Sequence, residues 1–296
     1  MFIRTWFRQT QLSMLYITCV ATIFYGCGLS VQQRAAIERF SVSTGEFAEL
    51  ASSEFVKSRT DVLEMNKLRL QLQDDTVKVT QIDEHFSVER VKVRVEAMAA
   101  LKGYADLLHV LVTTSQELPL RNAADSFVAS LRKVQGVSLS DEKAGAIAAA
   151  VQGVGGLIVE YMRAQAAREV VNAVHPTILQ ILELVRRDFD PAADHWSLGY
   201  EKIIVGLEGA AGLAAAGPNA AGTAALVGEA QVVAAQNRSR FRSVAEQVNN
   251  TAVSLREAQV NLRYAVHTTD VTMEDINSFA AKIDDFVKVY RILRDR

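Results

Sequence analysis

The chain has few cysteines and few prolines for its 296 residues, and its charges nearly balance. Both cysteines, Cys19 and Cys27, lie close to the N-terminus, so the body can form neither a disulfide nor a thiolate metal site. This excludes zinc fingers, redox dithiols and cysteine nucleophiles from the body. The formal net charge of −2 and the isoelectric point near 6.2 leave no basic footprint for nucleic acid, so we expect no nucleic-acid partner.

The scarcity of proline also indicates the fold class. Only four prolines occur, among many Ala, Val, Leu, Gln, Glu and Arg residues, which favours long helices over strands and turns. With 49% hydrophobic and 22% charged residues, the composition is that of an ordinary folded domain, large enough to bury a core.

The N-terminus has the pattern of an export signal. Arg4 and Arg8 precede a run with no charged residue, from Gln9 to Gln33, of which 12–26 is mostly apolar. A basic start followed by an apolar stretch of this length is typical of a signal peptide, and it is short for a membrane span of about 20 residues.

The end of this run, Ile23-Phe24-Tyr25-Gly26-Cys27, resembles the lipobox of bacterial lipoproteins. In that family a small residue precedes an invariant cysteine, the thiol receives a diacylglyceryl group, and the signal is cut just before it. The resemblance implies cleavage between Gly26 and Cys27 and a lipid on Cys27. Phe24 and Tyr25 depart from the commonest Leu-Ala or Leu-Ser pair.

Two other interpretations of the run stay open: an uncleaved signal anchor and an ordinary cleaved secretion signal. Cys19, behind Thr18 in the middle of the run, has a poorer processing context than Cys27. An Asp after the cysteine is the usual inner-membrane retention signal in enteric bacteria. Because Gly28 stands there, the analogy favours an outer-membrane anchor facing the periplasm.

We therefore divide the chain into a signal peptide (1–26), a lipidated tether (27–33) and one helical domain (34–296). Apolar spacings of three, four and seven, with turn and capping signals between them, predict the helices. Their expected ranges are 34–73, 78–116, 120–134, 141–187, 196–216, 218–266 and 273–293. Val91–Val95 alternates like a strand, but its helical flanks favour helix. Pro176 should kink or break the fourth helix.

The expected fold is all-α: an elongated antiparallel bundle of long, partly coiled-coil-like helices joined by short turns. The clearest seam belongs to the sixth helix. Its members are Phe241, Val244, Val248, Ala252, Leu255, Ala258, Leu262 and Ala265.

No catalytic motif appears in the sequence. The best polar cluster consists of Asp188, Asp190, Asp194 and His195, whose oxygen and nitrogen atoms could bind a divalent cation. An Asp- and Pro-rich helix connection has the same composition, and the calcium-loop pattern is missing, so we expect no metal. His109 fits a partly buried bundle residue. The sequence also has no HExxH pair, nucleophile elbow or phosphate loop, so we expect no cofactor and no enzyme.

Two surface features remain. Arg238, Arg240 and Arg242 form a small basic patch, which we expect to be a solvated helix face; contact with anionic lipid is the alternative. The segment 203–227 carries Glu208 as its only charge and resembles the insertion elements of α-helical pore-forming toxins.

We expect this segment to pack as a hairpin core around the turn Gly217-Pro218-Asn219. Its close-packed contact should come from Leu207, Leu213, Leu226 and the alanines between them.

Together these features predict a lipid-anchored helical protein of the cell envelope, facing the periplasm, without catalysis. Its role would be structural or in protein interaction, with contacts to the membrane through the lipid and to an unknown protein partner. The alternative is a membrane-active protein of pore-forming type that inserts the hairpin around 203–227.

Overall fold

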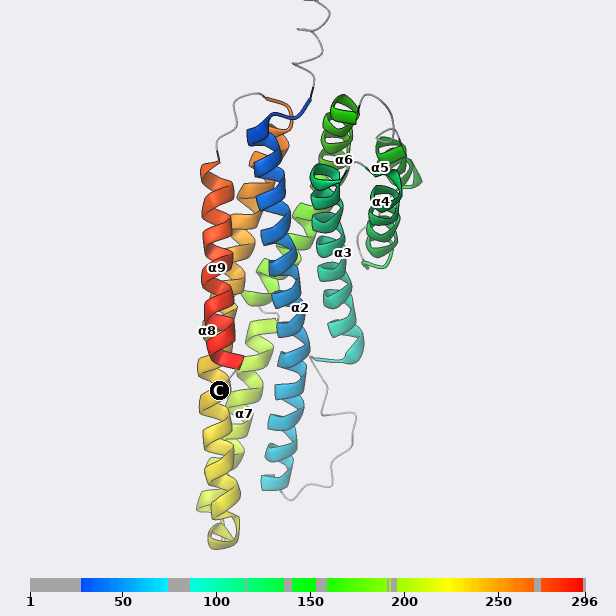
Figure 1. The fold of residues 1–296 in the computed structure, drawn as a ribbon. Coiled ribbons are helices and arrows are strands. Elements are labelled where there is room, and N and C mark those ends of the chain that lie inside the picture. The colour runs from blue at the N-terminus through cyan, green and yellow to red at the C-terminus, as the bar shows by residue number, and fades with distance from the viewer. Residues whose placement is uncertain are drawn as a thin grey trace, which may run out of the picture.

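The computed structural model describes residues 28–73, 86–114, 116–135, 140–152, 159–190, 192, 196–268 and 273–294. Within these ranges the regular elements are eight α-helices and no strand (Figure 1). They are α2 (Val31–Gln73), α3 (Val88–Thr113), α4 (Glu117–Leu131), α5 (Asp141–Gln152), α6 (Val159–Phe189), α7 (Trp196–Ala216), α8 (Ala220–Ala265) and α9 (Glu274–Arg294). The all-α bundle expected from the sequence is confirmed.

Two very long helices set the shape of the molecule. At 1.5 Å per residue, the 43 residues of α2 and the 46 residues of α8 each span roughly 65–70 Å. α2 contacts α3, α7, α8 and α9, so it lies at the centre of the elongated bundle (Figure 1). Of the remaining helices, α4 and α5 lie on the α3 side (Figure 1), whereas α6 packs against α8 as well as against α3 and α5.

Aromatic side chains fill the core at two levels. Near one end, Phe40 of α2 packs against Tyr104 of α3 and Phe279 of α9, with ring centroids 6.3 and 6.0 Å apart. Near the middle, Phe55 packs against Phe189 and Trp196 at 4.9 and 5.3 Å. All six rings are buried, and each such pair adds about 0.5–1.5 kcal/mol beyond its burial.

A glycine brings the side layer close to the centre. A Cβ added at Gly103 of α3 would lie 3.3 Å from the Phe127 Cα atom of α4. Because backbone atoms cannot move aside as a flexible side chain can, α4 packs this tightly on α3 only where the side chain is absent.

Several boundaries differ from those predicted. α2 begins at Val31 rather than at residue 34, because Ser30 caps it, as described below. The alternating stretch Val91–Val95 lies inside α3, so helical context overrides its strand propensity. The predicted helix 141–187 consists instead of α5 and α6.

Pro176 does not break the helix as predicted, because α6 runs on to Phe189. The proline itself is exposed, whereas Val174 and Ile178 on either side are fully buried. Packing of both halves of α6 on the core therefore offsets the roughly 3 kcal/mol that an interior proline costs. The expected α8 seam is buried along its length, while its supercoiling stays a prediction.

Candidate functional site at the α7–α8 hairpin and the two ends of the bundle

A buried group of charges joins α2 to α8. Arg240 donates from Nη1 to both carboxylate oxygens of Glu54, at 3.0 and 2.8 Å, and from Nη2 to Asp61 Oδ2 at 2.6 Å. The exposed fractions of these side chains are 11% for Arg240, 0% for Glu54 and 7% for Asp61. The two acids are seven residues apart, two turns of one helix, so both face the same guanidinium. We call these three residues with Tyr200 the Arg240 cluster.

Tyr200 adds α7 to the cluster. Its hydroxyl lies 3.2 Å from Asp61 Oδ2 and 3.1 Å from Asn237 Oδ1, and its single hydrogen is donated to one of these acceptors at a time. The ring stacks on Phe241 with a centroid distance of 4.0 Å and an interplanar angle of 14°. The Arg240 cluster therefore ties α2, α7 and α8 together at one level of the bundle.

Burial controls the titration of the cluster. It raises the pKa of Glu54 above the ordinary value of 4.5, although the charge of Arg240 acts in the opposite direction. It also raises the pKa of Tyr200, an effect that the nearby Asp61 carboxylate increases. For Arg240, burial favours the neutral form, but the Glu54 and Asp61 carboxylates outweigh it and the pKa is raised. The cluster thus holds helix register with paired charges rather than offering a reactive group to solvent.

The sequence contained a signal for this cluster. Glu54 and Asp61 each stand next to a residue of the apolar stripe of α2, Phe55 and Val62. Acids that repeat every seven residues beside such a stripe face the core, where they need a cation. Arg240 is that cation, but only the tertiary fold brings it there.

The predicted solvated patch of three arginines is therefore wrong for two of them. Arg240 is buried, and Arg238 binds α7: its Nε donates to Glu201 Oε1 at 2.9 Å and its Nη2 to Glu208 Oε2 at 2.8 Å. Only Arg242, with 67% of its side chain exposed, lies on the surface, 3.2 Å from Glu201 Oε1. Arg238 and Arg242 are four residues apart and share a helix face, where both contact Glu201, whereas Arg240 lies about 200° from each of them and faces the core.

The turn between α7 and α8 lies where the sequence predicts it. α7 ends at Ala216 and α8 begins at Ala220. Gly217 N donates to Ala214 O at 3.3 Å, and Ala220 N donates to Gly217 O at 3.2 Å. Gly217, Pro218 and Asn219 thus form the predicted reversal between two antiparallel helices.

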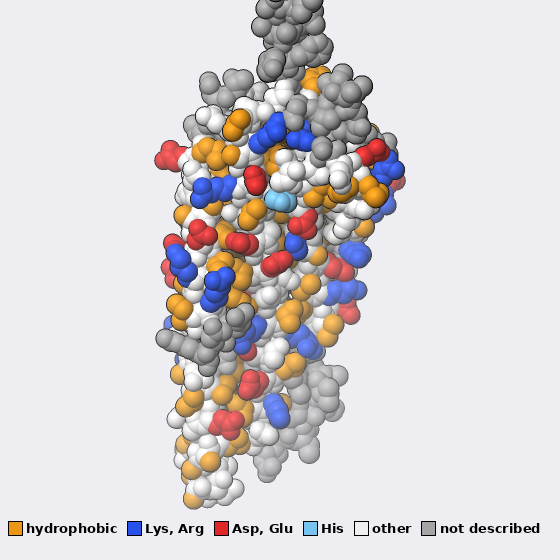
Figure 2. Space-filling model, in the orientation of Figure 1, with side chains coloured by type: hydrophobic (Ala, Val, Ile, Leu, Met, Phe, Trp, Pro, Cys, Tyr) orange, Lys and Arg blue, Asp and Glu red, His pale blue; other side chains and the backbone are white. Residues whose placement is uncertain are grey.

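The apolar end of this hairpin is buried only in part, whereas burial of the whole was predicted: Ala210, Ala211 and Val227 are buried, but Leu213 is not. We call residues 209–228 the hairpin tip; none of them is charged. Leu207, just before it, is fully buried and Leu226 packs partly on the core, but Leu213 is 74% exposed. In Figure 2 the lowest part of the visible face accordingly shows only apolar and uncharged side chains.

The exposure follows from the length of α2. A Cβ added at Gly206 would lie 3.2 Å from Arg69 Nη1, which places Gly206 beside the last turns of α2. α2 ends at Gln73, only four residues later. The hairpin tip continues past this point (Figure 1), so α7 and α8 there cover only each other.

The predicted polar cluster around Pro191 divides between different partners. Asp188 is buried and accepts from Arg94 Nη2 at 2.7 Å. Asp190 accepts from Arg186 Nη1 at 3.5 Å and from Ala192 N at 2.9 Å. Asp194 and His195 lie outside the described residues. Among the residues that the structure describes, no three side chains of metal-binding type form a group.

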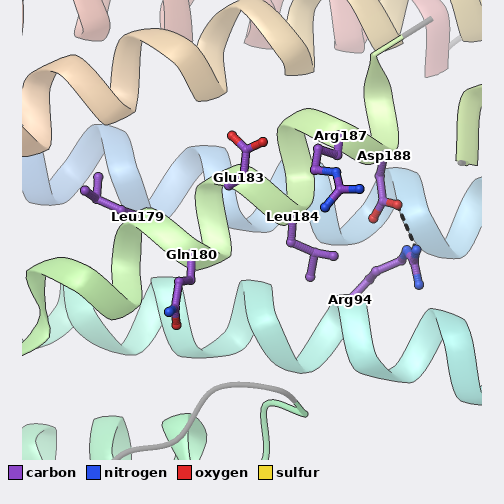
Figure 3. A pocket seen from close by; sticks show the side chains of 7 residues that line it. All are labelled: Arg94, Leu179, Gln180, Glu183, Leu184, Arg187 and Asp188. Carbon is purple, nitrogen blue, oxygen red and sulfur yellow. Dashed lines mark hydrogen bonds and ion pairs between the residues drawn. The ribbon is translucent and has the colours of Figure 1, made fainter. Parts of the chain in front are cut away.

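An open pocket of about 440 Å³ lies between α3 and α6 beside Asp188 (Figure 3). Its charged members are Arg94, Glu183, Arg187 and Asp188. The Arg94 guanidinium also lies 4.7 Å from the ring centroid of Trp196, a cation–π contact. Arg94 thus links α3, α6 and α7, so its contacts with Asp188 and Trp196 are structural. His109 is partly buried in α3, as expected.

The start of α2 is fixed to the end of α8. Ser30 Oγ accepts from Gln33 N at 3.0 Å while Gln33 Oε1 accepts from Ser30 N at 2.8 Å, a reciprocal capping pair. Gln33 Nε2 then donates to Ala265 O and Thr268 O at 2.8 and 2.9 Å. The predicted lipidation and cleavage residues, Cys27 and Gly26, lie outside the described residues.

Across the described ranges, no helix combines the length and the apolar character needed to cross a bilayer. No protein-family model, no curated protein and no solved structure matches this chain.

Proposed function

We propose that this protein is a lipid-anchored, non-catalytic interaction protein of the bacterial envelope, held to the outer membrane by Cys27 and facing the periplasm. One observation supports the proposal: α2, the first described helix after the predicted lipidation site, begins at one end of the bundle, and the uncharged hairpin tip with its exposed Leu213 forms the other (Figure 1). A protein that is fixed to a membrane and binds a partner needs an anchor and, away from it, an exposed surface for the partner.

The anchor rests on the lipobox resemblance and on acyl-chain energetics. Each buried CH₂ group contributes about 0.8 kcal/mol, and stable membrane attachment takes more than one acyl chain. A diacylglyceryl group on Cys27 meets that requirement without a membrane-spanning helix.

The chemistry of the hairpin tip favours a helical protein as partner. Its exposed residues are mostly Ala and Gly, which let helix backbones approach closely, and Leu213 supplies one larger apolar contact. The exposed acid Glu229 follows the tip on the α8 arm, and anionic lipid headgroups would repel it; Glu208, on the α7 arm, is paired with Arg238.

Labelling with a radioactive fatty acid tests the anchor. We expect Cys27→Ser to abolish labelling, and the matched variant Cys19→Ser to leave it unchanged, because Cys27 has the better processing context. Equal labelling of the parent and of Cys27→Ser would end the proposal.

A membrane-active, pore-forming-type protein is the second candidate, and the exposed Leu213 within an uncharged segment favours it. In this candidate, the hairpin around 203–227 inserts into lipid. Release of a dye from vesicles by the purified protein distinguishes the two. The interaction protein causes no release, whereas release that Leu213→Ser abolishes would support the pore.

A further inference from the structure

We infer that the lipidated protein stands end-on on its membrane, with the end of the bundle nearest Cys27 resting on the phospholipid headgroups. This inference rests on the proposed anchor. The surface concerned, the anchor-side face, consists of Val31 at the start of α2, Tyr161 at the start of α6 and Tyr264 at the end of α8.

The first support is the short connection between Cys27 and the folded bundle. Cys27 and Leu29 are two Cα steps apart, at most about 7 Å. Leu29 is already part of the hydrophobic core, and the next residue, Ser30, forms the capping pair with Gln33. Gln33 in turn holds two carbonyl groups at the end of α8. A lipid on Cys27 therefore brings this end of the bundle to the membrane surface.

Two hydrogen-bonded connections and the arrangement in Figure 1 show that the members of the face share one end. Gln33 joins the first turn of α2 to the last turn of α8, which contains Tyr264. Arg168 of α6 donates from Nε to Val266 O at 2.7 Å, so the first turns of α6, with Tyr161, lie at the same end. In Figure 1 the starts of α2 and α6 likewise lie together at the top.

The second support is where the exposed aromatic side chains lie. In the described part of the chain every Phe and Trp196 are buried, as are Tyr104 and Tyr200, and Tyr290 is half-buried. The two exposed aromatic side chains are Tyr161 at 44% and Tyr264 at 69%, and both belong to the anchor-side face.

Tyrosine is enriched at membrane–water interfaces, where the ring sits among the headgroups and the hydroxyl stays hydrated. Val31, the first residue of α2, adds an exposed apolar side chain at the same end of the bundle. The chemistry of the face therefore fits a lipid surface.

The end-on orientation carries the hairpin tip away from the anchoring membrane. The 43 residues of α2 separate the two ends by roughly 65 Å, and the tip continues beyond α2. A partner at the tip would then be met at a fixed height above the membrane, not in the anchoring bilayer.

Tryptophan quenching by brominated phospholipids tests this orientation. The lipidated mature protein, residues 27–296, would be placed in vesicles as Tyr264→Trp, and as the matched control Leu213→Trp at the opposite end. Both positions are exposed, so neither change disturbs packing. The parent supplies the background, because Trp196 is buried in the core. We expect the brominated lipid to quench the emission of Tyr264→Trp. We expect it to quench the emission of Leu213→Trp no more than that of the parent.

The intact mass is measured first, so that failure of the anchor is recognised separately. If the mass shows no lipid on Cys27, the proposed function fails. With the lipid present, quenching at both positions would mean a molecule lying flat, and quenching at Leu213→Trp alone would mean insertion by the tip. Quenching at neither would mean a face held off the membrane. Each of these three results overturns the end-on inference.

Discussion

At the residue scale, Arg240 shows how burial makes the stability of the fold depend on a charged side chain. Its guanidinium faces two carboxylates in the core, where taking each charge out of water costs several kcal/mol. Mutual attraction and the hydrogen bonds of the cluster offset this cost only while all the partners are present. The cluster is therefore a sensitive point for stability.

Replacing Arg240 with methionine should destabilise the protein by about 3–5 kcal/mol, because the buried Glu54 would lose its cation and Asp61 would keep only the partly exposed Lys57, at 3.1 Å. Arg242→Met is the matched control two positions along α8. Its side chain is mostly exposed, so we expect a change within about 0.5 kcal/mol. Denaturant unfolding of the two variants measures both values. Equal stability of the two would show that the cluster is not a buried ion group.

Glu54 should also leave a mark on the pH dependence of stability. Its pKa is raised in the fold, so above the ordinary value of 4.5 the folded protein holds this proton more tightly than the unfolded chain. Unfolding then releases a proton, and this group's contribution to stability falls as the pH rises through the folded pKa.

Glu54→Gln removes that contribution. The stability of the parent minus that of Glu54→Gln should fall as the pH is raised from about 4.5 through the folded pKa of Glu54. Urea unfolding at a series of pH values measures the difference, with Glu64→Gln, an exposed acid on the same helix, as control. A difference that rises with pH would contradict the direction of the shift.

At the scale of elements, the α7–α8 hairpin has two halves. The half from Trp196 to Leu207 packs on the core, with Tyr200, Ile204 and Leu207 fully buried. The other half, the hairpin tip, has only its own two arms for cover. One continuous apolar stretch of the sequence thus forms both a core-packed half and a largely exposed half, and the end of α2 marks the boundary between the two halves.

An aspartate in each half separates these purposes. Leu207→Asp should lower the free energy of unfolding by several kcal/mol, because an unpaired charge would enter the core. Leu213→Asp should leave the melting temperature unchanged, because that side chain is already in water. Thermal melts followed by circular dichroism compare the two. A large drop in the melting temperature for Leu213→Asp would show that Leu213 is buried in the core, as the sequence pattern predicts.

At the scale of the whole molecule, the bundle is long for its mass. A compact chain of 296 residues has a radius of gyration of about 19 Å and a diameter of roughly 50 Å. α8 alone is roughly 69 Å long, from its 46 residues. Small-angle X-ray scattering of the body without its signal should therefore give a maximum dimension above about 70 Å. A value near 50 Å would show that the long helices fold back on themselves.

The sequence by itself determined the helical class and most of the helix positions. Apolar spacing and turn residues are local properties, so the α7–α8 turn, the α8 seam and the start of α9 could all be predicted. Pro176 does not break its helix, because its local cost is offset by core contacts that the sequence does not display.

Only the tertiary structure decided which charges are buried and which apolar residues are exposed. Arg240 meets Glu54 across 186 residues, and Gln33 meets Ala265 across 232. Leu213 is exposed because α2 happens to end before the tip, not because of anything in its own neighbourhood. The physical reason is the same in each case: burial and pairing depend on where long helices lie side by side and where they end. Local sequence fixes each helix, but the alignment of one against another is set by packing over the whole core.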